Sequence, residues 1–157
     1  AVFLFMGPVI VSGSYYVQTG TLNPAVVLAS LPVGFLVAAI LHANNLRDLE
    51  IDRMFDKRTL ATLLGRTGAR FEYYILIGAT YLSQALMVLA GIVPWHTLIT
   101  LITLPASVQL MRIVATESEP RTLQPVLRRT ARLHMIFGSL FIAGWIAALL
   151  AERSGGA

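Results

Sequence analysis

Two carboxylates with polar neighbours follow a long apolar stretch in the first third of the sequence. Asp48 and Asp52 are four residues apart, which on a helix places both on one face, and Asn45 lies one turn earlier. Two like charges at this spacing cost an isolated helix about 0.2–0.5 kcal/mol, whereas a bound Mg2+ would reverse that sign. Mg2+ takes one or two carboxylates and completes its shell with water and phosphate oxygens.

Two adjacent basic residues, Lys57 and Arg58, follow the carboxylates. Arginine binds phosphate through a planar fork and lysine binds it as a point charge, so residues 44–59 predict a site for a metal and a diphosphate. The alternative is a solvated helix end beside a membrane, in which Arg47, Arg53 and Lys57 only pair with nearby acids. Composition and spacing alone favour the alternative.

The composition indicates a membrane protein. Of the 157 residues 56% are hydrophobic and 13% charged, and the mean hydropathy is +0.72. The 12 basic and 8 acidic residues are clustered, and no nucleic-acid-binding module is visible, so nucleic acid is not an expected partner. The absence of cysteine excludes thiolate chemistry, and His42, His96 and His134 do not have the spacing of metal ligands.

The intervals without Asp, Glu, Lys or Arg predict the crossings, because a helix needs about 20 apolar residues to span a bilayer. They favour an all-α polytopic bundle with about five transmembrane helices. Turn residues at 18–24 and 91–96 separate neighbouring crossings. The expected crossings are residues 1–17, 24–43, 73–90, 96–111 and 133–151, with polar loops at 44–72 and 112–132.

The basic residues predict the orientation. Eleven of the twelve lie in the two polar loops, and only Arg153 falls on the other side. By the positive-inside rule both loops are expected to be cytoplasmic. A different number of crossings would scatter the basic residues over both faces.

The motif at the membrane edge resembles that of a known family. Asn44-Asn45-x-x-Asp48-x-x-x-Asp52, followed by Lys57-Arg58-Thr59-Leu60-Ala61, is similar to the second aspartate-rich motif of the UbiA superfamily of intramembrane prenyltransferases. Together with Phe5-Met6-Gly7-Pro8-Val9 and Gly13-Ser14-Tyr15-Tyr16-Val17-Gln18, it is most similar to the branch that prenylates 1,4-dihydroxy-2-naphthoate in menaquinone synthesis. The similarity extends over the whole chain, but only its first 65 residues carry distinctive motifs.

This resemblance implies an enzyme that moves a polyprenyl group from polyprenyl diphosphate to an aromatic acceptor with Mg2+. It implies that Asp48 and Asp52 are metal ligands and that four neighbours contact the diphosphate: Asn44, Asn45, Lys57 and Arg58. It also implies that Tyr15 or Tyr16 lines the substrate pocket. With dihydroxynaphthoate the acceptor would lose carbon dioxide and give demethylmenaquinone, in a bacterial inner membrane.

The sequence departs from the family pattern in one respect. The first aspartate-rich motif is not among these residues. We therefore expect the chain to be the C-terminal part of a bundle of about nine helices, to need the N-terminal half of the same protein, and to be inactive alone. Two alternatives stay open: prenylation of 4-hydroxybenzoate or homogentisate, and a transporter or structural membrane subunit without catalysis.

Overall fold

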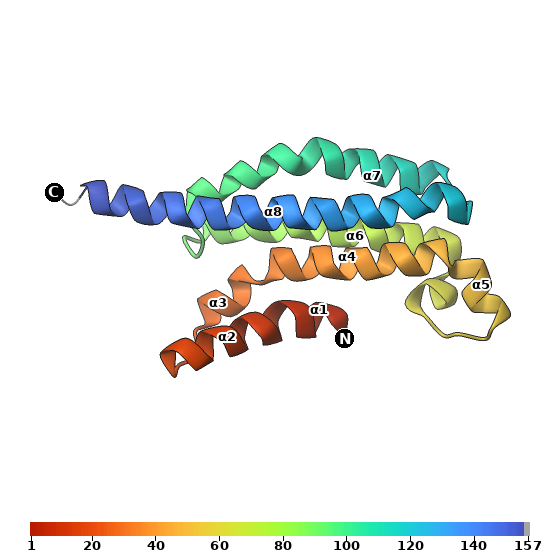
Figure 1. The fold of residues 1–157 in the computed structure, drawn as a ribbon, viewed down its shortest axis with the longest axis horizontal. Helices are drawn as coiled ribbons and strands as arrows, with labels where there is room; N and C mark the ends of the chain where they lie inside the picture. The colour runs from red at the N-terminus through yellow and green to blue at the C-terminus, as the bar shows by residue number, and fades with distance from the viewer. Residues whose placement is uncertain (156–157) are drawn as a thin grey trace.

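The computed structural model describes residues 1–155, which are largely helical and contain no strand. This confirms the all-α prediction. Figure 1 shows α4, α6, α7 and α8 running side by side, with α1 and α2 along one edge. The elements are α1 (Val2–Leu4), η1 (Phe5–Val9), α2 (Ile10–Thr19), α3 (Pro24–Ala29), α4 (Leu31–Arg47), α5 (Leu49–Met54), α6 (Leu60–Leu89), η2 (Trp95–Thr103), α7 (Leu104–Thr116) and α8 (Pro120–Gly155).

The first helical segment, Val2–Thr19, lies at the edge of the bundle. Its η1 turn is a π-helix that contains Pro8, which has no N–H to donate to the preceding turn. Gly7 packs so closely on α4 that a Cβ there would lie 2.9 Å from Gly34 Cα. Phe3 stacks on Phe35 with ring centroids 4.6 Å apart. Most of the segment's remaining large apolar side chains are exposed.

The turn predicted at 18–24 is present. Gly20 has a φ of 69°, and the Asn23 side chain accepts a hydrogen bond from Ala25 N at 2.9 Å, with Pro24 in the first turn of α3. The second predicted turn is also present, with Gly91 at a φ of 69°.

Among the described residues, four helical segments are long and apolar enough to cross a membrane: Val2–Thr19, Pro24–Arg47, Trp95–Thr116 and Pro120–Ser154. They correspond to four of the five expected crossings. The fifth, residues 73–90, falls on α6, which is not among them. That residues 73–90 cross the bilayer stays a prediction.

The two predicted polar segments are mostly helical. In 112–132, α7 runs to Thr116 and α8 begins at Pro120, so only residues 117–119 lie between them. In 44–72, α4 and α6 extend into the segment and α5 lies between them. Gly65, at φ 71° and ψ 175°, separates the first turn of α6 from its long part.

The segment after Pro94 is a 3-10 helix, where the sequence predicted an α-helix. Its threonines recur every third residue, which matches the three residues per turn of this helix and places all of them on one buried face. Thr97, Thr100 and Thr103 each donate a hydroxyl hydrogen bond to the carbonyl three residues earlier. Nine residues is long for such a helix.

Candidate functional site

The candidate site begins where α4 stops. Asp48 has φ −90° and ψ 5°, outside the helical range, and so separates α4 from α5. The two carboxylates therefore do not lie on one continuous helix. The fully buried Leu46 and Leu49 anchor the chain on both sides of the break, which favours this path over a straight helix into solvent. Asp48 and Asp52 are still one helical turn apart, because Asp52 N donates to Asp48 O at 2.8 Å.

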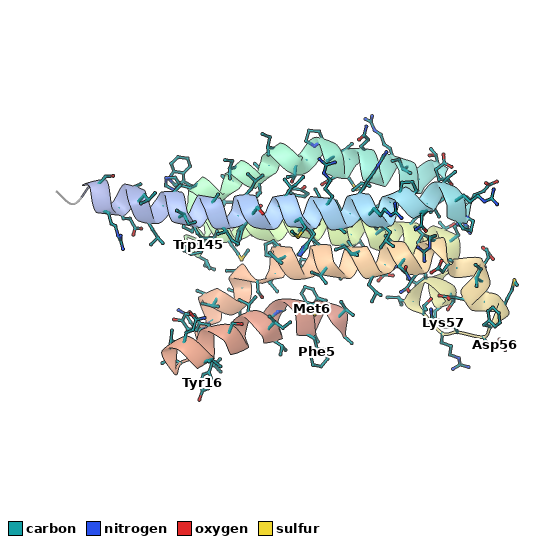
Figure 2. All side chains as sticks on the ribbon, in the orientation of Figure 1. Phe5, Met6, Tyr16, Asp56, Lys57 and Trp145 are labelled. Carbon is teal, nitrogen blue, oxygen red and sulfur yellow. The ribbon has the colours of Figure 1, made fainter. Side chains whose placement is uncertain are left out.

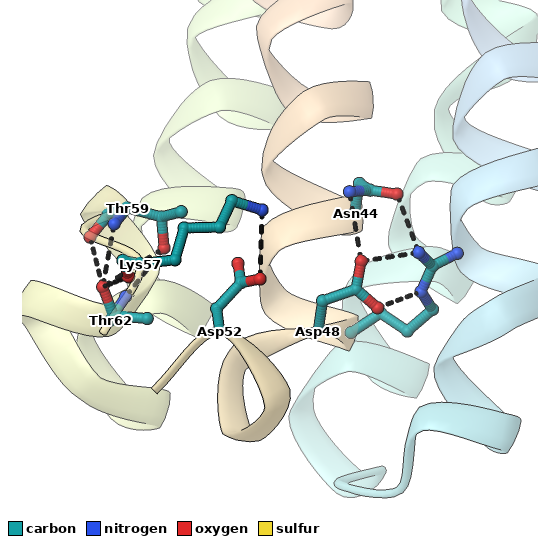
Figure 3. Close-up of polar contacts among 7 residues, drawn as sticks. Asn44, Asp48, Asp52, Lys57, Thr59 and Thr62 are labelled. Carbon is teal, nitrogen blue, oxygen red and sulfur yellow. Dashed lines mark hydrogen bonds and ion pairs between the residues drawn. The ribbon is translucent and has the colours of Figure 1, made fainter. Parts of the chain in front are cut away.

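Asp48 is held by basic and amide groups from α4. Arg47 donates from Nε to Oδ1 at 2.7 Å and from Nη2 to Oδ2 at 2.6 Å, a bidentate pair. Asn44 donates to Oδ2 at 3.3 Å and accepts from Arg47 Nη2 at 2.9 Å (Figure 3). The hydrogen bonds from Arg47 hold the pKa of Asp48 below its usual value, so Asp48 is ionised at neutral pH.

Asp52 is the more buried carboxylate, with 5% of its surface exposed. Lys57 Nζ lies 3.0 Å from Oδ1, while the buried Oδ2 has no hydrogen-bond partner within residues 1–155. Figure 3 shows the Asp52 carboxylate pointing towards Lys57 and the Asp48 carboxylate towards Asn44. A buried anionic oxygen without a donor is costly unless a cation or another donor reaches it, so Asp52 fits the role of a metal ligand.

The loop after α5 presents the two predicted phosphate-binding residues. Asp56 has a φ of 51°, and Lys57 N donates to Asp52 O at 2.8 Å, so the chain turns sharply before Lys57. Thr59 then caps α6 through a capping box with Thr62. Arg58 is exposed, and no ion pair involving it is present in the described residues.

The other predicted site residues are not all brought together. Asn45 is half-buried next to Asn44. Tyr15 and Tyr16 lie near the end of α2, and Figure 2 shows Tyr16 at the opposite end of the molecule from Lys57. Whether either tyrosine lines a substrate pocket stays a prediction.

The structure adds contacts that the sequence did not reveal. Arg47 Nη1 donates to Gln124 Oε1 at 2.8 Å, and Arg70 Nη2 donates to Glu117 O at 2.8 Å and to Ser118 Oγ at 3.0 Å. These bonds bring the two predicted polar segments to the same end of the bundle. The sequence could have indicated Arg47 as a partner of Asp48, because the two residues are adjacent. It could not have indicated Gln124, which lies 77 residues from Arg47.

A buried histidine supports the same region from inside the bundle. His42, 3% exposed, lies with Nε2 2.6 Å from Ala69 O and Nδ1 3.2 Å from Glu72 Oε2. His42 therefore joins α4 to α6 one turn before Asn45. Within residues 1–155 no group of three or more His, Asp or Glu side chains could hold a metal. Two carboxylates alone suit Mg2+ that takes its other ligands from water and phosphate.

Comparison with known proteins identifies the class. Residues 1–136 match the UbiA prenyltransferase family, and the chain belongs to this family. It is 34% identical over 144 residues to a 1,4-dihydroxy-2-naphthoate octaprenyltransferase of Escherichia coli, covering 92% of this chain and 47% of that protein. The enzyme of the same name from Mycobacterium tuberculosis is 35% identical over 147 residues, covering 94% of this chain and 49% of that protein.

A human relative is also similar. UbiA prenyltransferase domain-containing protein 1 of Homo sapiens is 30% identical over 147 residues, covering 94% of this chain and 42% of that protein. The chain spans about half the length of the curated relatives it matches, and corresponds to the C-terminal half of the naphthoate octaprenyltransferases.

Proposed function

We propose that the chain forms the C-terminal half of a membrane prenyltransferase that transfers a polyprenyl group from polyprenyl diphosphate to an aromatic acceptor. The observation that carries this proposal is the pair of carboxylates at the end of α4. Asp48 is ionised and held by Arg47, while Asp52 is buried with one oxygen free of donors among the described residues. Membership of the UbiA family supports the same activity.

The roles of the residues follow from charge. Asp48 and Asp52 would hold Mg2+, with Asn44 and Asn45 beside them and Lys57 and Arg58 on the diphosphate. When bound, Mg2+ would stabilise the negative charge that develops on the departing diphosphate. Lys57 is only 3.0 Å from Asp52 and lies on a mobile four-carbon stem, so its ammonium can move from the carboxylate to a phosphate oxygen.

The proposed acceptor is 1,4-dihydroxy-2-naphthoate. The bond between the allylic carbon and the diphosphate oxygen would break, a bond from that carbon to the naphthalene ring would form, and the ring carboxylate would leave as carbon dioxide. The product is the prenylated dihydroxynaphthalene, the reduced form of demethylmenaquinone, and its conversion to the quinone is a separate two-electron oxidation. The printed names of the bacterial relatives support this choice. 4-Hydroxybenzoate and homogentisate are the alternative acceptors.

The other half of the site is proposed to come from the N-terminal half of the same protein. The chain matches about half the length of its relatives, and its own two carboxylates make up only one aspartate-rich motif. We further propose that the polar ends of α4 to α8 face the cytoplasm of a bacterial inner membrane, because eleven of the twelve basic residues lie there. Tyr15 or Tyr16 would line the pocket.

The test is product formation by the full-length protein in membranes, with radiolabelled polyprenyl diphosphate, Mg2+ and a panel of the three acceptors. We expect Asp48→Asn and Asp52→Asn each to lower the rate at least about 100-fold, because each removes charge from the site of the developing diphosphate anion. Asp56→Asn is the matched control, since asparagine tolerates the left-handed φ of this exposed position.

The assay tests the metal assignment and the acceptor assignment separately. Full activity of both aspartate variants would refute the metal assignment. Turnover with 4-hydroxybenzoate but not with dihydroxynaphthoate would refute the acceptor assignment and leave the prenyltransferase assignment intact.

A further inference from the structure

A hollow between α7 and α8 is lined by apolar side chains along most of its length and by two arginines at one end. Its volume is about 350 Å3. Ala106 and Ile113 of α7 line it with Ile102 of η2, Ile136 of α8 and the two arginines, Arg129 and Arg132. The remaining lining residues are Thr103, Gln109, Leu110 and Leu133. A second hollow, lined by Gln124 and Arg128, shares Arg129 and Arg132 with the first, so the two meet at these arginines.

The arginines of this region have no acidic partner. Within residues 1–155, none of the five in the segment 112–132 forms an ion pair: Arg112, Arg121, Arg128, Arg129 and Arg132. Arg132 follows Arg128 by four residues and Arg129 by three, so all three charges lie on neighbouring turns of α8. Like charges at these spacings repel, and a bound anion would remove that repulsion.

The arginines lie at the depth where a bilayer surface is expected. From Arg132 to Glu152, α8 carries no charged residue, and at 1.5 Å per residue this stretch is about 30 Å long, the thickness of the hydrocarbon core. Arg112 ends a stretch of similar length that begins at Trp95, an exposed aromatic residue of the kind found at membrane surfaces. The hollow thus begins at the lipid headgroups and continues among the acyl chains.

We propose that this α7–α8 hollow binds one anionic phospholipid, with its phosphate on Arg129 and Arg132 and an acyl chain along the apolar lining. Arginine forks suit phosphate oxygens, and basic pockets between transmembrane helices suit anionic headgroups. The site is separate from the carboxylates of the α4–α5 break. Because Arg47 bonds to Gln124, one turn before Arg128, a lipid here would also steady the end of α8 that touches the candidate active site.

The test measures lipid binding, so it does not depend on turnover. The full-length protein in detergent is titrated with phosphatidylglycerol or with phosphatidylcholine of the same chains, and bound lipid is counted by native mass spectrometry. We expect one tightly held phosphatidylglycerol and at least tenfold weaker phosphatidylcholine binding. Arg129→Gln with Arg132→Gln should weaken phosphatidylglycerol binding about 10–30-fold, since each basic residue beside an anionic headgroup contributes to the binding free energy.

Two further variants separate a site from general charge attraction. Ala106→Phe fills the hollow and keeps both arginines, and it should also lose the tight phosphatidylglycerol. Arg121→Gln with Arg153→Gln removes the same net charge away from the hollow and should bind like wild type. Unchanged size-exclusion profiles establish that each variant is folded.

Several results would overturn the proposal. Equal binding of the two lipids, or wild-type binding by Ala106→Phe, would mean that no lipid occupies the hollow. Displacement by glycerol phosphate at equal concentration would mean an anion site without a chain site. Displacement of phosphatidylglycerol by farnesyl diphosphate at similar concentrations would assign the hollow to the prenyl donor instead.

Discussion

Replacing Gly144 with alanine should destabilise the bundle, although alanine is the better helix former. A Cβ at Gly144 would lie 2.5 Å from Thr97 Cα, 2.8 Å from Thr97 N and 2.9 Å from His96 O. Because these are backbone atoms, no side-chain rotation relieves the overlap, and α8 would have to move about 1 Å away from η2 to restore ordinary contact. This displacement would also strain the packing of α8 on α7.

Two opposing effects set the change in the free energy of unfolding of Gly144→Ala. Over-packing a well-packed interior costs about 1–3 kcal/mol, and a backbone collision belongs in the upper half of that range. The gain in helix propensity from glycine to alanine is about 1 kcal/mol. We therefore expect Gly144→Ala to lower the free energy of unfolding by about 1–2 kcal/mol.

Gly138 supplies the matched control, because it lies on the same helix and no atom lies within 4 Å of the Cβ it would gain. Gly138→Ala should raise the free energy of unfolding by up to about 1 kcal/mol. The measurement is SDS-induced unfolding of the full-length protein in mixed micelles, followed by helical circular dichroism. If Gly144→Ala were as stable as Gly138→Ala, the close approach of α8 and η2 would be refuted.

Two further predictions concern the interior and the orientation. Gln84→Leu should lower the free energy of unfolding by about 1 kcal/mol, since Gln84 donates to Thr97 O at 2.7 Å and accepts from Thr100 Oγ1 at 2.7 Å across helices. Ser83→Ala, whose hydroxyl bonds only within α6, is its control in the same unfolding assay, and equal losses would contradict the cross-helix role. Because the chain has no cysteine, Thr67→Cys and Gln124→Cys can each be labelled with an impermeant maleimide in vesicles. Both should react from one side and Thr21→Cys from the other, and opposite sides for Thr67 and Gln124 would sink the proposed topology.

The positions of the apolar helices could be predicted from the sequence because the constraint is local and strong. A bilayer requires long uncharged runs, and the turns between them need residues that tolerate a left-handed backbone or begin a helix. Gly20, Asn23 and Gly91 meet these needs where the runs are interrupted. The orientation in the membrane could likewise be predicted from the sequence, because it rests on the clustering of the basic residues.

The detailed path of the chain could not be predicted, because it depends on packing between distant residues. The break at Asp48 places Leu46 and Leu49 in the core, and Arg47 turns back onto Asp48 while reaching Gln124. The local spacing of the two carboxylates does not reveal this break. Similarly, η2 has a 3-10 conformation and approaches α8 closely at Gly144, and no local sequence pattern predicts this approach.

The composition of α6 explains why it falls outside the helices that qualify as membrane spans. Two of its polar side chains are buried and bonded to neighbouring helices: Tyr73 OH lies 2.8 Å from Thr130 Oγ1, and Tyr81 OH lies 2.7 Å from Thr103 Oγ1. Tyrosine hydroxyls prefer water to lipid, although here protein groups satisfy them. A helix surrounded by protein needs fewer apolar residues than one surrounded by lipid, because its polar groups find partners inside the bundle. Residues 73–90 therefore stay a predicted crossing, since α6 packs against α4 and α7 within the bundle and its two tyrosines bond to α8 and η2.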